Sequence, residues 1–146
     1  MWFSKPKNEP KRPFFVWSEL DHSVGVAVFD DEHQHLTSMM AEIDQAMQGE
    51  HDRQRALMLM ENLVQALRDH FTHEEGKMEE VQFPDLGTHA AEHTALLARA
   101  KDMLYKFRNG TLSARLVAAF FRDWLIPHIQ HYDRKYSASL RRQGLC

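Results

Sequence analysis

Apolar residues recur three and four positions apart along four long stretches of the chain, the spacing that places side chains on one face of an α-helix. These stretches predict helices at about residues 31–48, 52–80 and 85–108, and a fourth from Thr111 or Ser113 to about residue 136. Gly49, residues 81–84 and Asn109-Gly110 interrupt the pattern, so the connections are short. Helices joined by short turns pack antiparallel. The chain is therefore expected to form an all-α, up-down-up-down antiparallel four-helix bundle.

The two ends of the chain lack this periodicity. Residues 1–13 are rich in proline and charge, which predicts a flexible N-terminal arm. Residues 14–30 are apolar without a helical period and predict an extended lead-in, with Asp30 or Asp31 as the N-cap of the first helix. Pro127 lies inside the last predicted helix, where it predicts a local kink. The predicted organisation is an arm at 1–13, a bundle at 14–137 and a fraying tail at 138–146.

Polar residues with metal-ligand chemistry interrupt the apolar faces of all four predicted helices. His89 and His93 stand four apart, so both project from one face. In an antiparallel bundle the starts of the first and third helices lie beside the ends of the second and fourth. Seven such residues fall at that end: His33, His70, Glu74, His89, His93, His128 and Asp133. Because unpaired polar groups are costly in an apolar core, a bound metal is the simplest way to stabilise them all.

The size of this set favours iron over zinc. Zinc sites usually take four protein ligands, whereas seven ligands with two carboxylates suit two ions that share bridges. His128 and Asp133 are five apart, about 140° around an α-helix, and are expected to splay on either side of the inward direction. A ferritin-like site needs Glu-x-x-His on two helices. The pairs Glu19/His22 and Glu32/His35 have that spacing but crowd into one segment.

Composition narrows the class of protein. A formal net charge of -3 argues against nucleic acid as a partner, and 43% hydrophobic with 27% charged residues is typical of a globular chain in water. The apolar run 116–121 is too short for membrane insertion. The first residues lack the apolar core of a secretory signal, so we expect a cytoplasmic protein. The lone Cys146 permits no internal disulfide.

Four segments resemble the signature segments of the bacterial hemerythrins: FDDEHQHL, HFTHEE, FPDLGTHAAEH and WLIPHIQHYDRKY. The resemblance covers about residues 15–136. It implies that one iron ion is bound by three histidines and a second by two, with two carboxylates and an oxo or hydroxo oxygen bridging them. The implied ligands are His89, His93 and His128 for the first ion, His33 and His70 for the second, and Glu74 and Asp133 for the bridges.

The resemblance also implies a function. Members of this family bind dioxygen reversibly at the open position of the second iron, in a pocket that here matches Leu36, Phe71, Trp124 and Leu125. We therefore expect a monomeric binding protein rather than an enzyme. Its role would be to store dioxygen or to deliver it to an oxygen-using enzyme. The alternatives are a di-iron redox enzyme that reduces peroxide or nitric oxide, and an oxygen, redox or iron sensor. Four other histidines are expected to lie outside the site: His22, His35, His51 and His73.

Overall fold

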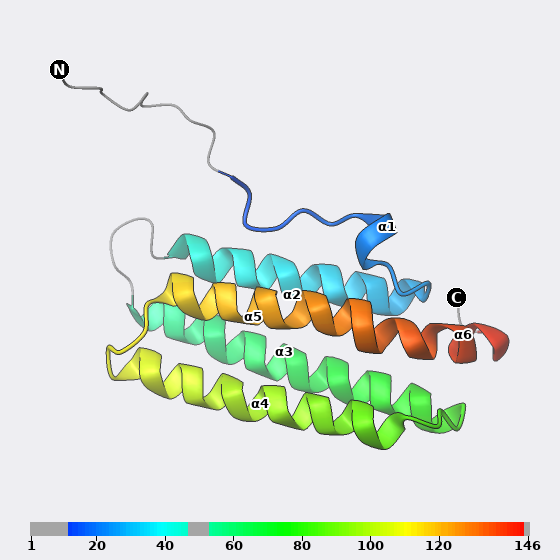
Figure 1. The fold of residues 1–146 in the computed structure, drawn as a ribbon. Coiled ribbons are helices and arrows are strands. Elements are labelled where there is room, and N and C mark those ends of the chain that lie inside the picture. Colours follow the sequence, from blue (N-terminus) through cyan, green and yellow to red (C-terminus); the bar gives the residue numbers. More distant parts are fainter. Residues whose placement is uncertain (1–11, 47–52, 145–146) are drawn as a thin grey trace.

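Four long antiparallel helices form the bundle (Figure 1). The computed structural model describes residues 12–46 and 53–144. The long helices are α2 (Ala27–Ala46), α3 (Arg53–Glu80), α4 (Leu86–Arg108) and α5 (Ala114–His128). α2 packs against α3 and α5, and α4 packs against the same two helices. The expected all-α four-helix bundle is confirmed. Within the described ranges, no helix has the length and apolar composition needed to cross a membrane.

The N-terminal lead-in differs from the extended segment expected. A short helix, α1 (Glu19–His22), interrupts it, and α2 begins at Ala27 rather than at residue 31. Asp30 is therefore not an N-cap but lies inside α2. Its buried carboxylate accepts hydrogen bonds from Ser23 Oγ at 2.6 Å and from the Val24 backbone N–H at 2.8 Å. These bonds fold the lead-in back onto the helix start. Residues 1–11 of the expected arm fall outside the described part of the chain.

Gly25, in the turn before α2, has the left-handed backbone conformation, with a φ of 73°. A Cβ there would lie 3.1 Å from Ser137 Oγ. Replacing Gly25 with alanine should lower the free energy of unfolding by about 1–2 kcal/mol, because an L-residue is strained at positive φ. Urea denaturation measures the change. Gly76→Ala is the control: Gly76 lies within α3 with nothing near its Cβ position, so alanine should add about 0.5–1 kcal/mol. A neutral Gly25→Ala would contradict the expected strain.

The last helix continues past the point where fraying was expected. α5 passes into a π-helix, η1 (Ile129–Asp133), and then into α6 (Arg134–Arg142). The sequence predicts a local kink at Pro127, and the structure has a π-helix that begins two residues later, at Ile129. The fourth helix was expected to end near residue 136. It extends to Arg142 because Tyr136 and Leu140 are fully buried and fix α6 against the bundle.

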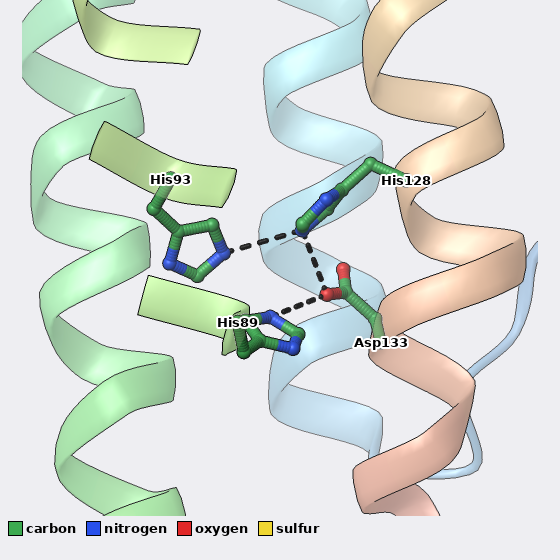
Figure 2. Close-up of side chains that lie close together, drawn as sticks. All are labelled: His89, His93, His128 and Asp133. Atoms are coloured by element: carbon green, nitrogen blue, oxygen red, sulfur yellow. Dashed lines mark hydrogen bonds and ion pairs between the residues drawn. The ribbon is translucent and has the colours of Figure 1, made fainter. Parts of the chain in front are cut away.

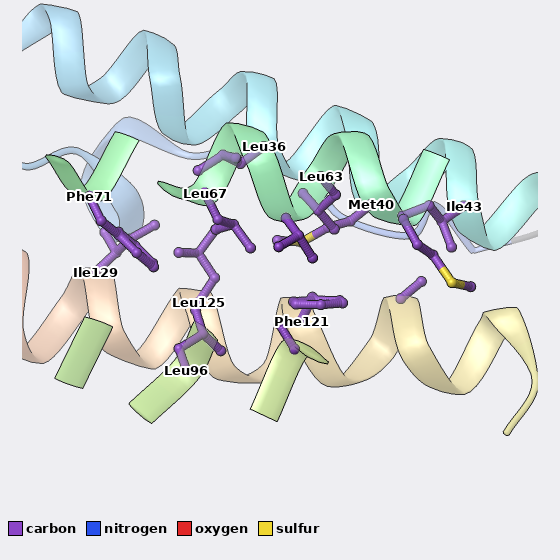
Figure 3. Packing of buried hydrophobic residues seen from close by; sticks show 14 of the residues in the cluster. Leu36, Met40, Ile43, Leu63, Leu67, Phe71, Leu96, Phe121, Leu125 and Ile129 are labelled. Carbon is purple, nitrogen blue, oxygen red and sulfur yellow. The ribbon is translucent and has the colours of Figure 1, made fainter. Parts of the chain in front are cut away.

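The apolar core fills the bundle away from its charged surface. The apolar residues that recur three and four positions apart in the first three helices are buried at most positions. Met47, which ends this series in the first helix, lies outside the described residues. In α5, helical spacing predicts Val117, Phe120, Trp124 and His128 as the inward face. Val117 and His128 are buried as expected, but Phe120 and Trp124 are half-buried, and Phe121 and Leu125 are buried instead. Figure 3 shows Phe121 and Leu125 meeting side chains from the other helices in this core. Leu116, which the sequence pattern places beside this inward face, is 59% exposed.

Candidate metal centre

The seven polar residues expected at one end of the bundle do lie together there, and each is at most 4% exposed. They come from α2, α3, α4, α5 and η1. Their side-chain donor atoms form two groups, within each of which all atoms lie inside 4.8 Å of one another. The groups are His89, His93, His128 with Asp133, and His33, His70, Glu74 with Asp133.

The first group is built mainly from α4 and the end of α5 (Figure 2). His89 Nε2 and His128 Nε2 each lie 3.0 Å from Asp133 Oδ1. His93 Nε2 lies 3.2 Å from His128 Nε2. The three imidazoles thus turn the same type of nitrogen toward one point beside a carboxylate oxygen. That convergence is what a metal with nitrogen and oxygen ligands requires.

The two carboxylates face both groups. Asp133 turns Oδ1 toward the first group and Oδ2 toward His33 Nε2, at 3.2 Å. Glu74 Oε1 lies 2.8 Å from His70 Nε2 and 3.6 Å from His93 Nε2. Each carboxylate is therefore placed between the groups, in the position that a bridging ligand would occupy.

The π-helix explains how His128 and Asp133 reach one point. In an α-helix, residues five apart would splay, as was expected here. In a π-helix, hydrogen bonds join residues five positions apart, so two such residues lie one turn apart on the same side of the helix. The expectation of splayed side chains is therefore wrong, and the separation of 3.0 Å between His128 Nε2 and Asp133 Oδ1 follows from the wider turn.

Several of these buried atoms have no hydrogen bond. They include the Nε2 atoms of His33, His70 and His89. Glu74 Oε1 and both oxygens of Asp133 are in the same state. They approach one another closely but without hydrogen-bonding geometry. Buried polar atoms are nearly always satisfied in native proteins, so a cluster of exceptions calls for another partner. Metal ions fit this donor set.

Burial and neighbouring charges set the protonation of the donors. Burial, together with the nearby His128 and His89, lowers the pKa of His93 to about 2, so this imidazole is neutral and able to bind metal. Burial would raise the pKa of Asp133, but the surrounding histidines hold it well below its usual value. Burial would lower the pKa of His70, but Glu74 and Glu32 raise it to about 10. Without metal, His70 therefore retains a proton between two carboxylates.

Three outer contacts were not expected from the sequence. Glu32 contacts His70 Nδ1 through Oε1 and His73 Nδ1 through Oε2, both at 2.7 Å. Glu75 Oε2 lies 3.1 Å from His93 Nδ1. The buried hydroxyl of Tyr136 donates a short hydrogen bond to Glu74. Burial and the negative charges of Glu74 and Asp133 raise the pKa of Tyr136, so the phenol stays a donor.

A sequence signal existed for only one of these contacts. Tyr136 follows Asp133 by three residues, so helical spacing places both on one side. Glu32 and Glu75 reach across to other helices, which spacing within one helix does not reveal. Of the histidines expected outside the site, His35 is exposed, His22 is buried against Phe15, and His51 lies outside the described residues.

Aromatic rings lie flat against two of the imidazoles. Phe71 stacks on His93 with ring centroids 3.8 Å apart. Trp124 stacks on His128 at 4.6 Å. Of the four residues expected to form a ligand pocket, Leu36, Phe71 and Leu125 are buried and point into the apolar interior (Figure 3), while Trp124 is half-buried.

Comparison with known proteins assigns the chain to a family. The Hemerythrin HHE cation binding domain matches residues 24–139. The chain belongs to the hemerythrin family. As a member of that family, it is 29% identical over 127 residues to a bacteriohemerythrin of Methylococcus capsulatus, covering 86% of this chain and 95% of that protein. It is 31% identical over 128 residues to a myohemerythrin of Riftia pachyptila, covering 86% and 93% of the two chains.

Solved hemerythrin structures share the fold. A wild-type hemerythrin crystal structure superposes with a TM-score of 0.80 at 26% identity, covering 86% of this chain and 97% of that chain. The structure of an L114A hemerythrin mutant gives a TM-score of 0.81 at 25% identity, covering 88% and 98%. The resemblance to hemerythrins inferred from four short segments is thus confirmed over most of the chain.

Proposed function

We propose that the protein binds dioxygen reversibly at a non-haem di-iron centre, for storage or for delivery to an oxygen-using enzyme. One observation carries the proposal: two buried groups of donor atoms share Asp133, and Glu74 faces both. Two ferrous ions at this centre supply the electrons that reversible dioxygen binding requires. A cytoplasmic, monomeric protein fits this role.

Each donor has a place in this proposal. His89, His93 and His128 hold one ion, and His33 and His70 hold the other. Glu74 and Asp133 would bridge the two ions, together with an oxo or hydroxo oxygen. The second ion would then have fewer protein ligands than the first, which would leave a position for dioxygen. The group with two histidines would therefore be the one that faces dioxygen.

The proposed dioxygen pocket is formed by Leu36, Phe71, Trp124 and Leu125. Its role is to keep water from the open position. Leu36 and Leu125 are at most 1% exposed, so the wall they form is dry. A dry apolar wall admits a small neutral molecule and disfavours charged ones. The stacked rings of Phe71 and Trp124 also hold His93 and His128 in place.

The decisive experiment measures iron content and absorption together. We expect about two irons per chain, given more donors than zinc's usual four. The anaerobically reduced protein should be colourless, colour on exposure to oxygen, and lose that colour under vacuum. One tetrahedral metal per chain would contradict the di-iron centre. Irreversible oxidation, with sustained turnover of peroxide or nitric oxide and a reductant, would instead support a redox enzyme.

Trp124→Ala tests the water barrier. The variant should keep both irons but convert to the ferric form faster and admit azide faster, because loss of the half-buried indole opens the apolar wall of the proposed pocket to water. We expect each rate to rise at least tenfold, which corresponds to lowering the activation free energy by about 1.4 kcal/mol. Stopped-flow absorbance measures both rates. Phe120→Ala, a half-buried aromatic residue one turn earlier, is the control. Unchanged rates in Trp124→Ala would remove this residue from the pocket.

A further inference from the structure

Glu32 holds two histidines of the neighbouring helix at once. It lies on α2, and its two carboxylate oxygens lie 2.7 Å from the Nδ1 atoms of His70 and His73 on α3. Phe29, also on α2, contacts the same two rings edge-on, with centroids 6.1 Å from His70 and 5.0 Å from His73. Because each oxygen of Glu32 contacts one histidine and Phe29 packs against both imidazole rings, the carboxylate is held in one orientation.

This contact fixes which nitrogen of His70 faces the site. With Nδ1 bonded to Glu32, Nε2 is left to point at Glu74 Oε1, 2.8 Å away. A carboxylate on the outer nitrogen of a metal-binding imidazole sets its tautomer and orientation and raises its basicity. His33, the other imidazole of this group, has no hydrogen bond on Nδ1. Among the described residues of this group, His70 is therefore the imidazole whose outer nitrogen is held by a carboxylate, and that carboxylate is Glu32.

The other group has an analogous contact. Glu75 on α3 lies 3.1 Å from Nδ1 of His93 on α4. His128 of that group has no hydrogen bond on Nδ1. Each group thus contains one imidazole held by a carboxylate from an adjacent helix, and the two carboxylates are different residues.

We propose that Glu32 is a positioning residue for the metal ion held by His33 and His70, and that Glu75 is its counterpart for the ion held by His89, His93 and His128. The proposal rests on the two-metal centre proposed above. It assigns each outer carboxylate to one ion, so their loss should have separate effects, unlike loss of the shared Glu74 or Asp133.

The test is a cobalt(II) titration of the full metal-free chain, followed by absorbance and competition with a chelator. The parent should bind two ions. Glu32→Ala should weaken one of the two by roughly 10- to 100-fold and leave the other near the parent value. Glu32→Gln should fall between, because its amide oxygen can still accept from Nδ1 but carries no charge. Glu42→Ala, an exposed glutamate on the same helix, is the matched control and should change neither affinity.

Double variants show which ion is affected. In a His33→Ala background, where the second ion is already weakened, adding Glu32→Ala should leave the remaining tight ion unchanged. In a His89→Ala background, the same addition should weaken the remaining ion by the full factor. Glu75→Ala should give the reverse pattern. Circular dichroism of each metal-free variant establishes that it is folded.

Two kinds of failure are distinguishable. A parent chain that binds fewer than two cobalt ions would overturn the di-iron centre itself. A parent that binds two, with a folded Glu32→Ala variant that weakens both ions equally or neither, would overturn only the role assigned to Glu32. Full loss in Glu32→Gln, equal to that in Glu32→Ala, would show that the negative charge is needed, and thus that positioning alone is not the cause.

Discussion

Glu74→Ala should remove both irons, whereas His33→Ala should leave one tightly bound. Glu74 is fully buried and faces both groups, 2.8 Å from His70 and 3.6 Å from His93. A bridging carboxylate binds both ions and offsets their mutual repulsion. His33 belongs to one group only. We take the loss of a ligand to cost each ion that it binds roughly 3–5 kcal/mol, the cost of breaking a buried charge pair. Elemental analysis after anaerobic loading should therefore give less than half an iron per chain for Glu74→Ala and about one iron per chain for His33→Ala.

Two further variants separate bridging from structural support. Glu74→Gln keeps the volume and can still accept the Tyr136 hydrogen bond, but it lacks the charge that bridges. It should lose iron almost as fully as Glu74→Ala while unfolding at a higher temperature. Glu79→Ala, an exposed glutamate of the same helix, should retain both irons. Retention of two irons and reversible oxygen binding by Glu74→Ala would contradict the bridging role.

Periodicity within single helices predicted the bundle and the gathering of the donors. It works because an apolar face must be buried, so a histidine on that face is carried to the interior with it. His89 and His93 illustrate this: they stand on the α4 face between Leu86 and Leu96. The same logic failed at α5, where Phe120 and Phe121 are both apolar. Only contacts with the other helices decide that Phe121 is the buried one.

Other features depend on contacts that spacing does not contain. α2 starts early because Asp30 bonds backward to Ser23 and Val24, which competes with the N-cap role its position indicates. The π-helix after Pro127 converts a five-residue spacing from splayed to aligned. Glu32 contacts a histidine 38 residues away, so no local pattern points to it. These are the places where tertiary structure overrides the local rule.

Removing the metal should lower the melting temperature strongly without unfolding the bundle. Ligands that bind only the folded state stabilise it by mass action, and an ion present at a thousand times its Kd contributes about 4 kcal/mol. For a chain of this size each kcal/mol corresponds to about 2–4 °C, so two ions should account for about 15–30 °C. In the metal-free protein both ring nitrogens of His33, Oε1 of Glu74 and both carboxylate oxygens of Asp133 are buried without a hydrogen-bond partner, which adds to the loss.

The loss should also be local. Met40, Ile43 and Phe121 are buried in the apolar core, and none of these residues contributes to the metal groups (Figure 3). This apolar part of the core should hold the helices together without metal. Calorimetry of the loaded, chelated and reloaded protein measures the shift. Amide hydrogen exchange should show faster exchange near His128 and Asp133 after chelation, with Met40 and Ile43 still protected. Equal melting temperatures with and without metal would show that the ions bind at the periphery. Loss of amide protection throughout the chain after chelation would show that the apolar core cannot maintain the bundle alone.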